Sequence, residues 1–264
     1  MKNIAVLIDF TEGSITALVQ AETFAKKIGA TLHAVNIAPS PDKIASATSN
    51  LTQFLEKYAA NSQDIKLEVG EGNLFTALPT ILGRFEPSLV IVCTHGIKGM
   101  FQHLFGAHIL KLVQSIPYPS IVIQENNQTD ISSINKILFP LGPHPDFSIK
   151  IKQTIALALI LQAEVYLYKI ERPGMGYEDQ LDQNFQHAKN AFTENKITTH
   201  RVIDELQIIS AGYSRQTIEY AYKNQIQIIS LMASVSNLDL LFGVGDKENF
   251  MVNTYGIPIL CCME

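Results

Sequence analysis

The stretch Ile4-Ala5-Val6-Leu7-Ile8-Asp9 has a counterpart 133 residues later, Ile137-Leu138-Phe139-Pro140-Leu141-Gly142. At the same offset, residues 30–37 (ATLHAVNI) correspond to residues 163–170 (AEVYLYKI). Further along, residues 89–92 correspond to residues 228–231 with an offset of 139 residues, which also places Gly106 on Gly245 and Pro119 on Pro258. A repeat that covers most of the chain predicts two homologous domains.

Within each repeat, apolar runs alternate with segments of helical spacing. The runs are continuous and rich in Val, Ile and Leu, which is typical of strands buried on both faces. Helical spacing covers residues 15–26, 51–58 and 78–85, and then residues 151–161, 185–192 and 217–222. Gly29 stands where a helix C-terminal cap is expected. The alternation predicts an α/β fold in which each half is a doubly wound, five-stranded parallel sheet with helices on both faces.

The length of 264 residues accommodates two domains of ordinary size. We predict a first domain over residues 1–125, a polar linker over 126–133 and a second domain over 134–264. The polar stretches Pro39–Asn50 and Arg172–Asp179 occupy corresponding places in the two halves. Both are predicted to be long surface loops.

Composition excludes several classes of protein. The chain is 47% hydrophobic, which is too apolar for a disordered protein, and its net charge of −5 provides no broad basic field. We therefore expect neither a nucleic-acid partner nor a membrane partner. No apolar run approaches the roughly 20 residues of a membrane span. The three cysteines suggest no disulfide framework and no metal-ligand spacing is present, so we expect a cytoplasmic protein without a metal site.

The polar residues that follow the predicted strands indicate a ligand site. Asp9 ends the first strand, Cys93-Thr94-His95-Gly96 ends the fourth, and Gly106-Ala107-His108 opens the last helix of the first half. Doubly wound sheets bind ligands outside the carboxyl ends of their strands. A glycine loop that leads into a helix N-terminus offers free amides and partial positive charge to a phosphate.

Together, the strand that ends in Asp9 and the Thr-His-Gly-x9-Gly loop resemble the universal stress proteins, and the repeat resembles their tandem form. The resemblance implies an adenine-nucleotide-α-hydrolase-like fold and, for the ATP-binding branch, the pattern Gly-x2-Gly-x9-Gly-Ser/Thr. It implies ATP or AMP as the ligand. It further implies that three residues frame adenine and ribose and that four face the phosphates. These are Leu7, Asp9 and Ile37, and then Gly96, Gly106, Ala107 and His108.

Both halves depart from that pattern. Cys93 replaces its first glycine and Ala107 its Ser/Thr. Losing a hydroxyl that donates to a charged phosphate costs about 1.5–3 kcal/mol. In the second half Gly142 stands for Asp9, Met232 and Val235 stand for the loop glycines, and Asp246 stands for the hydroxyl. We therefore expect a partial nucleotide site in the first half and none in the second.

Several residues have a structural alternative to the ligand role. Asp9 would equally bond turn amides, with Thr11 or Ser14 as the helix cap. Cys93 is either a redox-sensitive thiol or a small apolar filler. His108 either touches phosphate or is solvated, and Ser214 is predicted to cap a helix that begins near residue 216.

Three functions follow from these alternatives. The first is a stress-response factor that binds adenine nucleotide, and the second is a scaffold of the same fold that acts through protein–protein contacts. Slow ATP hydrolysis is the third, but no catalytic residue is assigned, because no base is evident and Ala107 removes the obvious hydroxyl. The two halves are expected to pack as a pseudo-dimer through the strands near residues 121–123 and 257–259. A homodimer of the whole chain and an unknown protein partner complete the expected partners.

Overall fold

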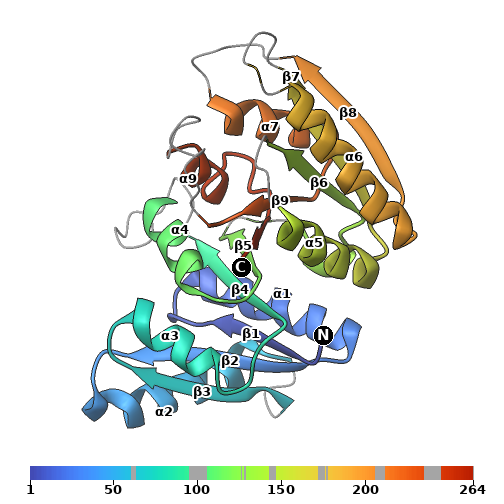
Figure 1. Ribbon diagram of the computed structural model, residues 1–264. Helices are drawn as coiled ribbons and strands as arrows, with labels where there is room; N and C mark the ends of the chain where they lie inside the picture. Colours follow the sequence, from blue (N-terminus) through green and yellow to red (C-terminus); the bar gives the residue numbers. More distant parts are fainter. Residues whose placement is uncertain are drawn as a thin grey trace.

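The chain forms one ten-stranded sheet in the order β3-β2-β1-β4-β5-β10-β9-β6-β7-β8 (Figure 1). The computed structural model describes residues 1–60, 64–94, 106–125, 127, 129–142, 147–171, 176, 178–205, 212–234 and 245–263. The strands are β1 (Asn3–Leu7), β2 (Thr31–Ala38), β3 (Lys66–Glu71), β4 (Leu89–Thr94), β5 (Ser120–Gln124), β6 (Lys136–Leu141), β7 (Glu164–Glu171), β8 (Thr199–Glu205), β9 (Ile228–Met232) and β10 (Ile259–Cys262).

Each half contributes five parallel strands, and the two halves repeat the same register. Ile4 pairs with Leu32 on β2 and with Leu89 on β4. In the second half, Ile137 pairs with Val165 and with Ile228. These partners are related by the offsets of 133 and 139 residues seen in the sequence. The predicted fold class and its internal repeat are therefore confirmed.

The only antiparallel pair among these strands joins β5 to β10 at the centre of the sheet. Val122 faces Ile259, Ile121 faces Leu260, and Ser120 faces Cys261. Because the two halves meet antiparallel, their strands run in opposite directions. The carboxyl ends of the strands of one half therefore lie beside the amino ends of the strands of the other half, and these two rows of strand ends are called opposite edges of the sheet below.

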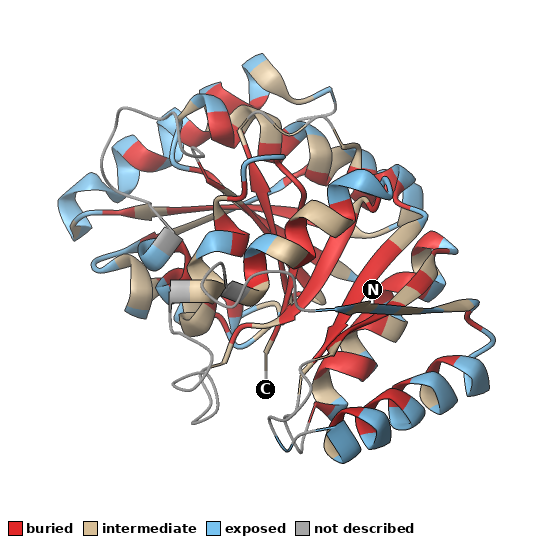
Figure 2. Cartoon of the chain, turned by 90° about the horizontal axis from the view of Figure 1, so that it is seen from above, coloured by how far each residue is buried: buried red, intermediate tan, exposed pale blue. Residues whose placement is uncertain are grey.

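Helices cover both faces of this sheet and complete three layers, with the buried residues concentrated in the strands and on the inner helix faces (Figure 2). One face carries α1 (Glu12–Ile28), α2 (Ile44–Tyr58), α5 (Ser148–Leu161) and α6 (Glu178–Glu194). The other carries α3 (Leu74–Leu82), α4 (Gly106–Ser115), α7 (Gly212–Lys223) and α9 (Gly245–Met251). Each face has one apolar cluster that contains residues of both halves, so the halves share their core.

Local sequence signals account for the helix ends. Gly29 adopts a left-handed conformation at φ 65° and caps α1, as predicted.

Between the halves, the 3-10 turn η3 (Ile131–Ser133) lies against α1. Its Ile131 N–H donates to Oε1 of Gln20, and Lys27 donates from Nζ to the Ser132 carbonyl oxygen.

The predicted loop over Pro39–Asn50 is wrong. A 3-10 turn, η1 (Pro41–Lys43), leads directly into α2, which begins at Ile44. The hydroxyls of Thr48 and Thr52 donate to carbonyl oxygens one turn earlier, so a Ser/Thr-rich stretch is compatible with a helix. Of the second predicted loop, Arg172–Asp179, residues 172–175 and 177 lie outside the described residues, and α6 already begins at Glu178.

Two strands have no clear signal in the sequence. The edge strands β3 and β8 are largely exposed or half-buried, and so lack the continuous apolar runs of the inner strands.

Among the described residues, no helix has both the length and the apolar character that a membrane span requires.

We predict that the whole molecule unfolds in one cooperative transition, because the sheet and both apolar clusters are continuous across the halves. Leu260→Ala in the central pair should lower the free energy of unfolding by about 2–5 kcal/mol. Differential scanning calorimetry and denaturant titration measure both quantities.

The matched control is Leu159→Ala, because Leu159 lies on α5 with 52% of its surface exposed. That change should stay within about 0.5 kcal/mol of the wild type. Two separate endotherms, or equal effects of the two substitutions, would contradict a shared core.

Candidate functional site

The first candidate site lies where β1 and β2 end. The Ile8 N–H donates to the Val35 carbonyl oxygen, and Asn36 donates from Nδ2 to the Ile8 carbonyl oxygen at 2.8 Å. These bonds fix the chain as it leaves the sheet. The half-buried side chains of Leu7 and Ile37 pack on the cluster that faces α3 and α4. The structure therefore brings Leu7 and Ile37, two of the three residues predicted to frame adenine and ribose, to the carboxyl ends of neighbouring strands.

Asp9 is exposed and organises the turn that enters α1. Its Oδ1 accepts from Thr11 N–H at 3.1 Å, from Thr11 Oγ1 at 2.6 Å and from Ser14 Oγ at 2.5 Å. Phe10 between them has a φ of 66°, a conformation that is uncommon outside glycine. Thr11 is the helix cap and accepts from Ser14 N–H. The structural role considered for Asp9 is thus present, and it uses one carboxylate oxygen.

The remaining predicted residues belong to the start of α4. The helix begins at Gly106, and Ala107 and His108 are exposed in its first turn. Gly96 and His95 lie outside the described residues. No described residue group offers the three His, Cys, Asp or Glu side chains of a metal site.

Cys93 faces α1. A Cβ atom built on Gly13, in the first turn of α1, would lie 3.0 Å from the Cys93 Sγ. The thiol therefore occupies space that a side chain at position 13 would need. Burial raises the pKa of Cys93, and the carboxylates of Glu125 and Asp9 raise it further. The thiol is therefore protonated and held in packing, which is the filler role rather than the redox role.

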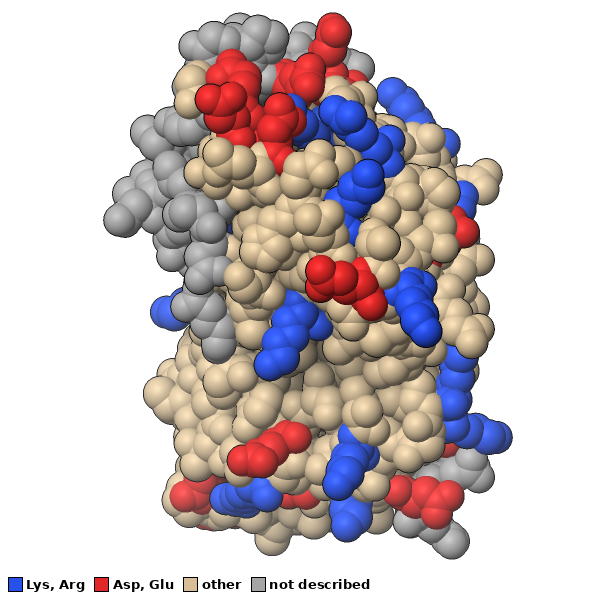
Figure 3. Space-filling view, turned by 45° about the vertical axis from the view of Figure 1, so that its right-hand side comes forward, with Lys and Arg blue, Asp and Glu red and all other residues tan. Residues whose placement is uncertain are grey.

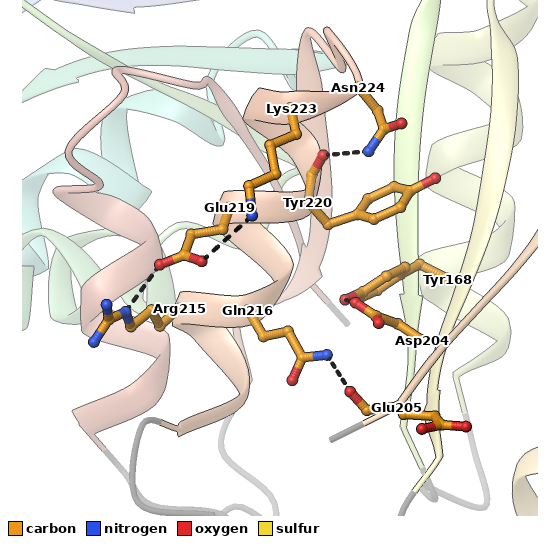
Figure 4. A network of polar contacts seen from close by, with 9 residues as sticks. All are labelled: Tyr168, Asp204, Glu205, Arg215, Gln216, Glu219, Tyr220, Lys223 and Asn224. Carbon is orange, nitrogen blue, oxygen red and sulfur yellow. Dashed lines mark hydrogen bonds and ion pairs between the residues drawn. The ribbon is translucent and has the colours of Figure 1, made fainter. Parts of the chain in front are cut away.

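In the second half, the end of β6 corresponds to the end of β1, and aromatic side chains pack in this region. Tyr213 on α7 contributes a hydroxyl that lies 3.5 Å from the Leu141 carbonyl oxygen at the end of β6. Tyr168 on β7 donates to Oδ2 of Asp204 at 2.9 Å, and its ring lies 4.7 Å from that of Tyr220. Figure 4 shows Tyr220 and Gln216 of α7 facing β7 and β8, with Gln216 bonded to the Glu205 carbonyl oxygen.

Asp246, at the start of α9, caps α7. Its carboxylate accepts from the Tyr213 N–H at 2.9 Å, from the Ser214 N–H at 3.1 Å and from the Ser214 hydroxyl. The predicted cap at Ser214 is wrong, because α7 begins at Gly212 and Ser214 is a donor within its first turn. A carboxylate from the next helix thus occupies the amides of this N-terminus.

Two lysines of the second half are not among the predicted site residues. Lys150 corresponds to Ala17 and Lys247 to His108 by the offsets of the repeat. An alignment of the two halves, position by position, identifies both lysines as charged residues that the first half lacks at the same positions.

Comparisons with known proteins agree with this architecture. Residues 1–124 match the model of the universal stress protein family. A universal stress protein from Archaeoglobus fulgidus matches 99% of this chain and 96% of its own, with 11% identity and a TM-score of 0.70. A universal stress protein described as putative, from Pseudomonas aeruginosa, matches 100% and 93%, with 14% identity and a TM-score of 0.62.

A domain of a transport protein also resembles this fold. The cytoplasmic domain of a prokaryotic cation chloride cotransporter matches 100% of this chain and 95% of its own, with 11% identity and a TM-score of 0.51. At such identities the likeness concerns the fold alone. A search of curated sequences finds no match.

We predict that all three cysteines react slowly with Ellman's reagent in the native protein at pH 8. Burial raises the pKa of Cys93 and of Cys261, and raises that of Cys262 to about 11, so the reactive thiolates are scarce. Protein unfolded in guanidinium should titrate all three at the rate of free cysteine. A thiol that reacts at that rate in the folded state would contradict the packing described for Cys93.

Asp246→Ala should lower the free energy of unfolding by about 1–3 kcal/mol, because it leaves two partly buried amides and one hydroxyl without their acceptor. Glu248→Ala, in the same turn of α9, serves as the control and should change stability by less than about 0.5 kcal/mol. Denaturant titration gives both values. If Asp246→Ala and Glu248→Ala change the free energy of unfolding equally, the hydrogen bonds of Asp246 to α7 do not stabilise the fold.

Proposed function

Residues 1–124 match the universal stress protein family, and on that premise we propose that the first half of the chain binds an adenine nucleotide, ATP or AMP, as part of a response to stress. The observation that carries this proposal is the geometry around Asp9. The carboxylate is exposed at the end of β1, and every hydrogen bond that a described residue makes with it goes to Oδ1. Oδ2 then serves as an acceptor for ribose hydroxyls.

Neighbouring residues supply what the rest of a nucleotide requires. Leu7 and Ile37 offer half-buried apolar surface for adenine. The start of α4, where Ala107 and His108 are exposed, offers helix-terminal amides and a favourable dipole for phosphate. The structural support is strongest for the nucleoside. Because Ala107 lacks a hydroxyl, the phosphates are held by amides and binding is weak.

The second half takes no nucleotide in this proposal. Tyr213 lies over the end of β6, and Gly142 replaces the ribose-binding carboxylate. We assign no catalytic residue to either half.

A protein-binding scaffold is the second candidate, and one surface favours it. Tyr222 and Tyr255 stack at 3.9 Å between ring centroids while remaining 58% and 42% exposed. They lie beside a hollow of about 480 Å³ between α7 and the end of α9. Exposed aromatic side chains of this kind are enriched at protein interfaces. A second copy of the chain or another protein would be the partner.

Nucleic acid and membranes stay outside the proposal. Basic and acidic side chains are interspersed on the face drawn in Figure 3, with no continuous basic field. The described cysteines are unpaired, which agrees with the reducing cytoplasm as the proposed location.

Isothermal titration with ATP and AMP tests the nucleotide proposal. We expect one saturable site per chain, and Asp9→Asn should weaken it at least tenfold, because a charged acceptor is lost while the turn keeps an oxygen. Ala107→Ser should tighten ATP binding about tenfold to a hundredfold and leave adenosine unaffected, since the hydroxyl reaches phosphate alone.

Asp64→Asn is the control, because Asp64 is exposed at the amino end of β3, at the opposite edge of the sheet. Absence of binding at millimolar nucleotide in both wild type and Ala107→Ser would reject the nucleotide site and leave the scaffold.

A further inference from the structure

Lys150 is a buried lysine near the N-terminus of α5. The residue is 6% exposed, its Nζ donates to the Pro140 carbonyl oxygen at 2.5 Å, and Nζ lies 4.1 Å from the centroid of the Phe139 ring. Within the described part of the chain, no carboxylate contacts this amine. An ammonium group buried without a counter-ion is costly, and the positive end of a helix adds to that cost.

A second amine lies at the neighbouring strand. Lys247 on α9 donates from Nζ to the Ser234 carbonyl oxygen at 2.6 Å, just after the end of β9. Pro140 is the penultimate residue of β6, and β6 pairs with β9. The strand order of the second half reverses between these two strands. Crevices at such a switch point are where α/β sheets bind ligands.

The two halves therefore carry opposite charge at equivalent crevices. In the first half the positions hold Ala17, His108 and the carboxylate Asp9, and in the second they hold Lys150, Lys247 and Gly142. The acid that the second half gains, Asp246, has its carboxylate bonded to the N-terminus of α7.

We propose that the second half binds a small oxyanion, the size of phosphate or sulfate, between Lys150 and Lys247 at the carboxyl ends of β6 and β9. The ligand carries no nucleoside, because Tyr213 lies over the end of β6. This site is independent of the nucleotide site and lies at the opposite edge of the sheet.

Binding at this site is coupled to proton uptake. Burial lowers the pKa of Lys150 to about 7; Cys262 on β10 opposes this shift, and Lys247 on α9 adds to it. Of the ionisable groups on α6, His187 packs on Phe147, and Asp182 is paired with Lys169 of β7. The amine of Lys150 is therefore partly uncharged near neutral pH, and an anion that binds beside it draws a proton onto it.

Sulfate is the suitable probe, because its charge does not change between pH 6 and 9. Isothermal titration at constant ionic strength, set with chloride, should give one saturable site per chain. Affinity should fall roughly tenfold from pH 6.5 to pH 8.5, and titrations in buffers of different ionisation enthalpy should report proton uptake. AMP should not compete with sulfate.

Lys150→Met and Lys247→Gln should each abolish saturable binding, and the exposed Lys152→Gln on the same helix should leave it unchanged. Asp9→Asn should not affect sulfate, so a failure of the nucleotide site does not bear on this one. If Lys150→Met does not fold, Lys247→Gln and the pH profile remain decisive. Sulfate binding that is unsaturable, independent of pH or equal in Lys247→Gln would overturn the proposal.

Discussion

The antiparallel pairing of β5 with β10 holds this molecule together. Without it, each half would present an unpaired inner edge lined by buried residues such as Ile121 and Leu260, and an exposed apolar edge promotes association. With it, two five-stranded sheets become one, and the apolar cluster on each face continues from one half into the other. Buried contacts extend the junction, since Gln124 on β5 donates to the Asn253 carbonyl oxygen and Gln114 on α4 to that of Ala233.

The same pairing separates the two crevices. Because the halves run antiparallel, their strands end at opposite edges of the sheet, so a ligand at one crevice has no direct contact with the other. The backbone register is conserved between the halves, whereas the side chains at the strand ends have diverged. Gly142 stands where the first half has Asp9, and the buried Lys150 stands where it has Ala17. Register depends on the interior strands, and the residues at their ends are free to change chemistry.

Side-chain packing in the crevices follows from compensation between neighbours. The thiol of Cys93 occupies space that Gly13 leaves open, and the carboxylate of Asp246 satisfies amides that a helix start would otherwise expose. Two departures from the family pattern in this chain, Cys93 and Asp246, are thus matched by a partner on another element. Such matched changes stabilise the fold while removing groups that the pattern assigns to a ligand.

The sequence alone determined the fold class, the repeat, the inner strands and the position of Asp9, because continuous apolar runs and a constant offset are properties of the chain itself. It did not reveal the edge strands β3 and β8, whose half-exposed residues carry no strong period, or the start of α2 over residues 44–50, whose polar residues resemble a loop. Only the tertiary structure decided which groups meet: that Cys93 packs on Gly13, that Asp246 caps α7, and that Lys150 is buried beside Pro140. These contacts join residues far apart in the chain, and their energies depend on burial and distance, which exist only once the sheet has formed.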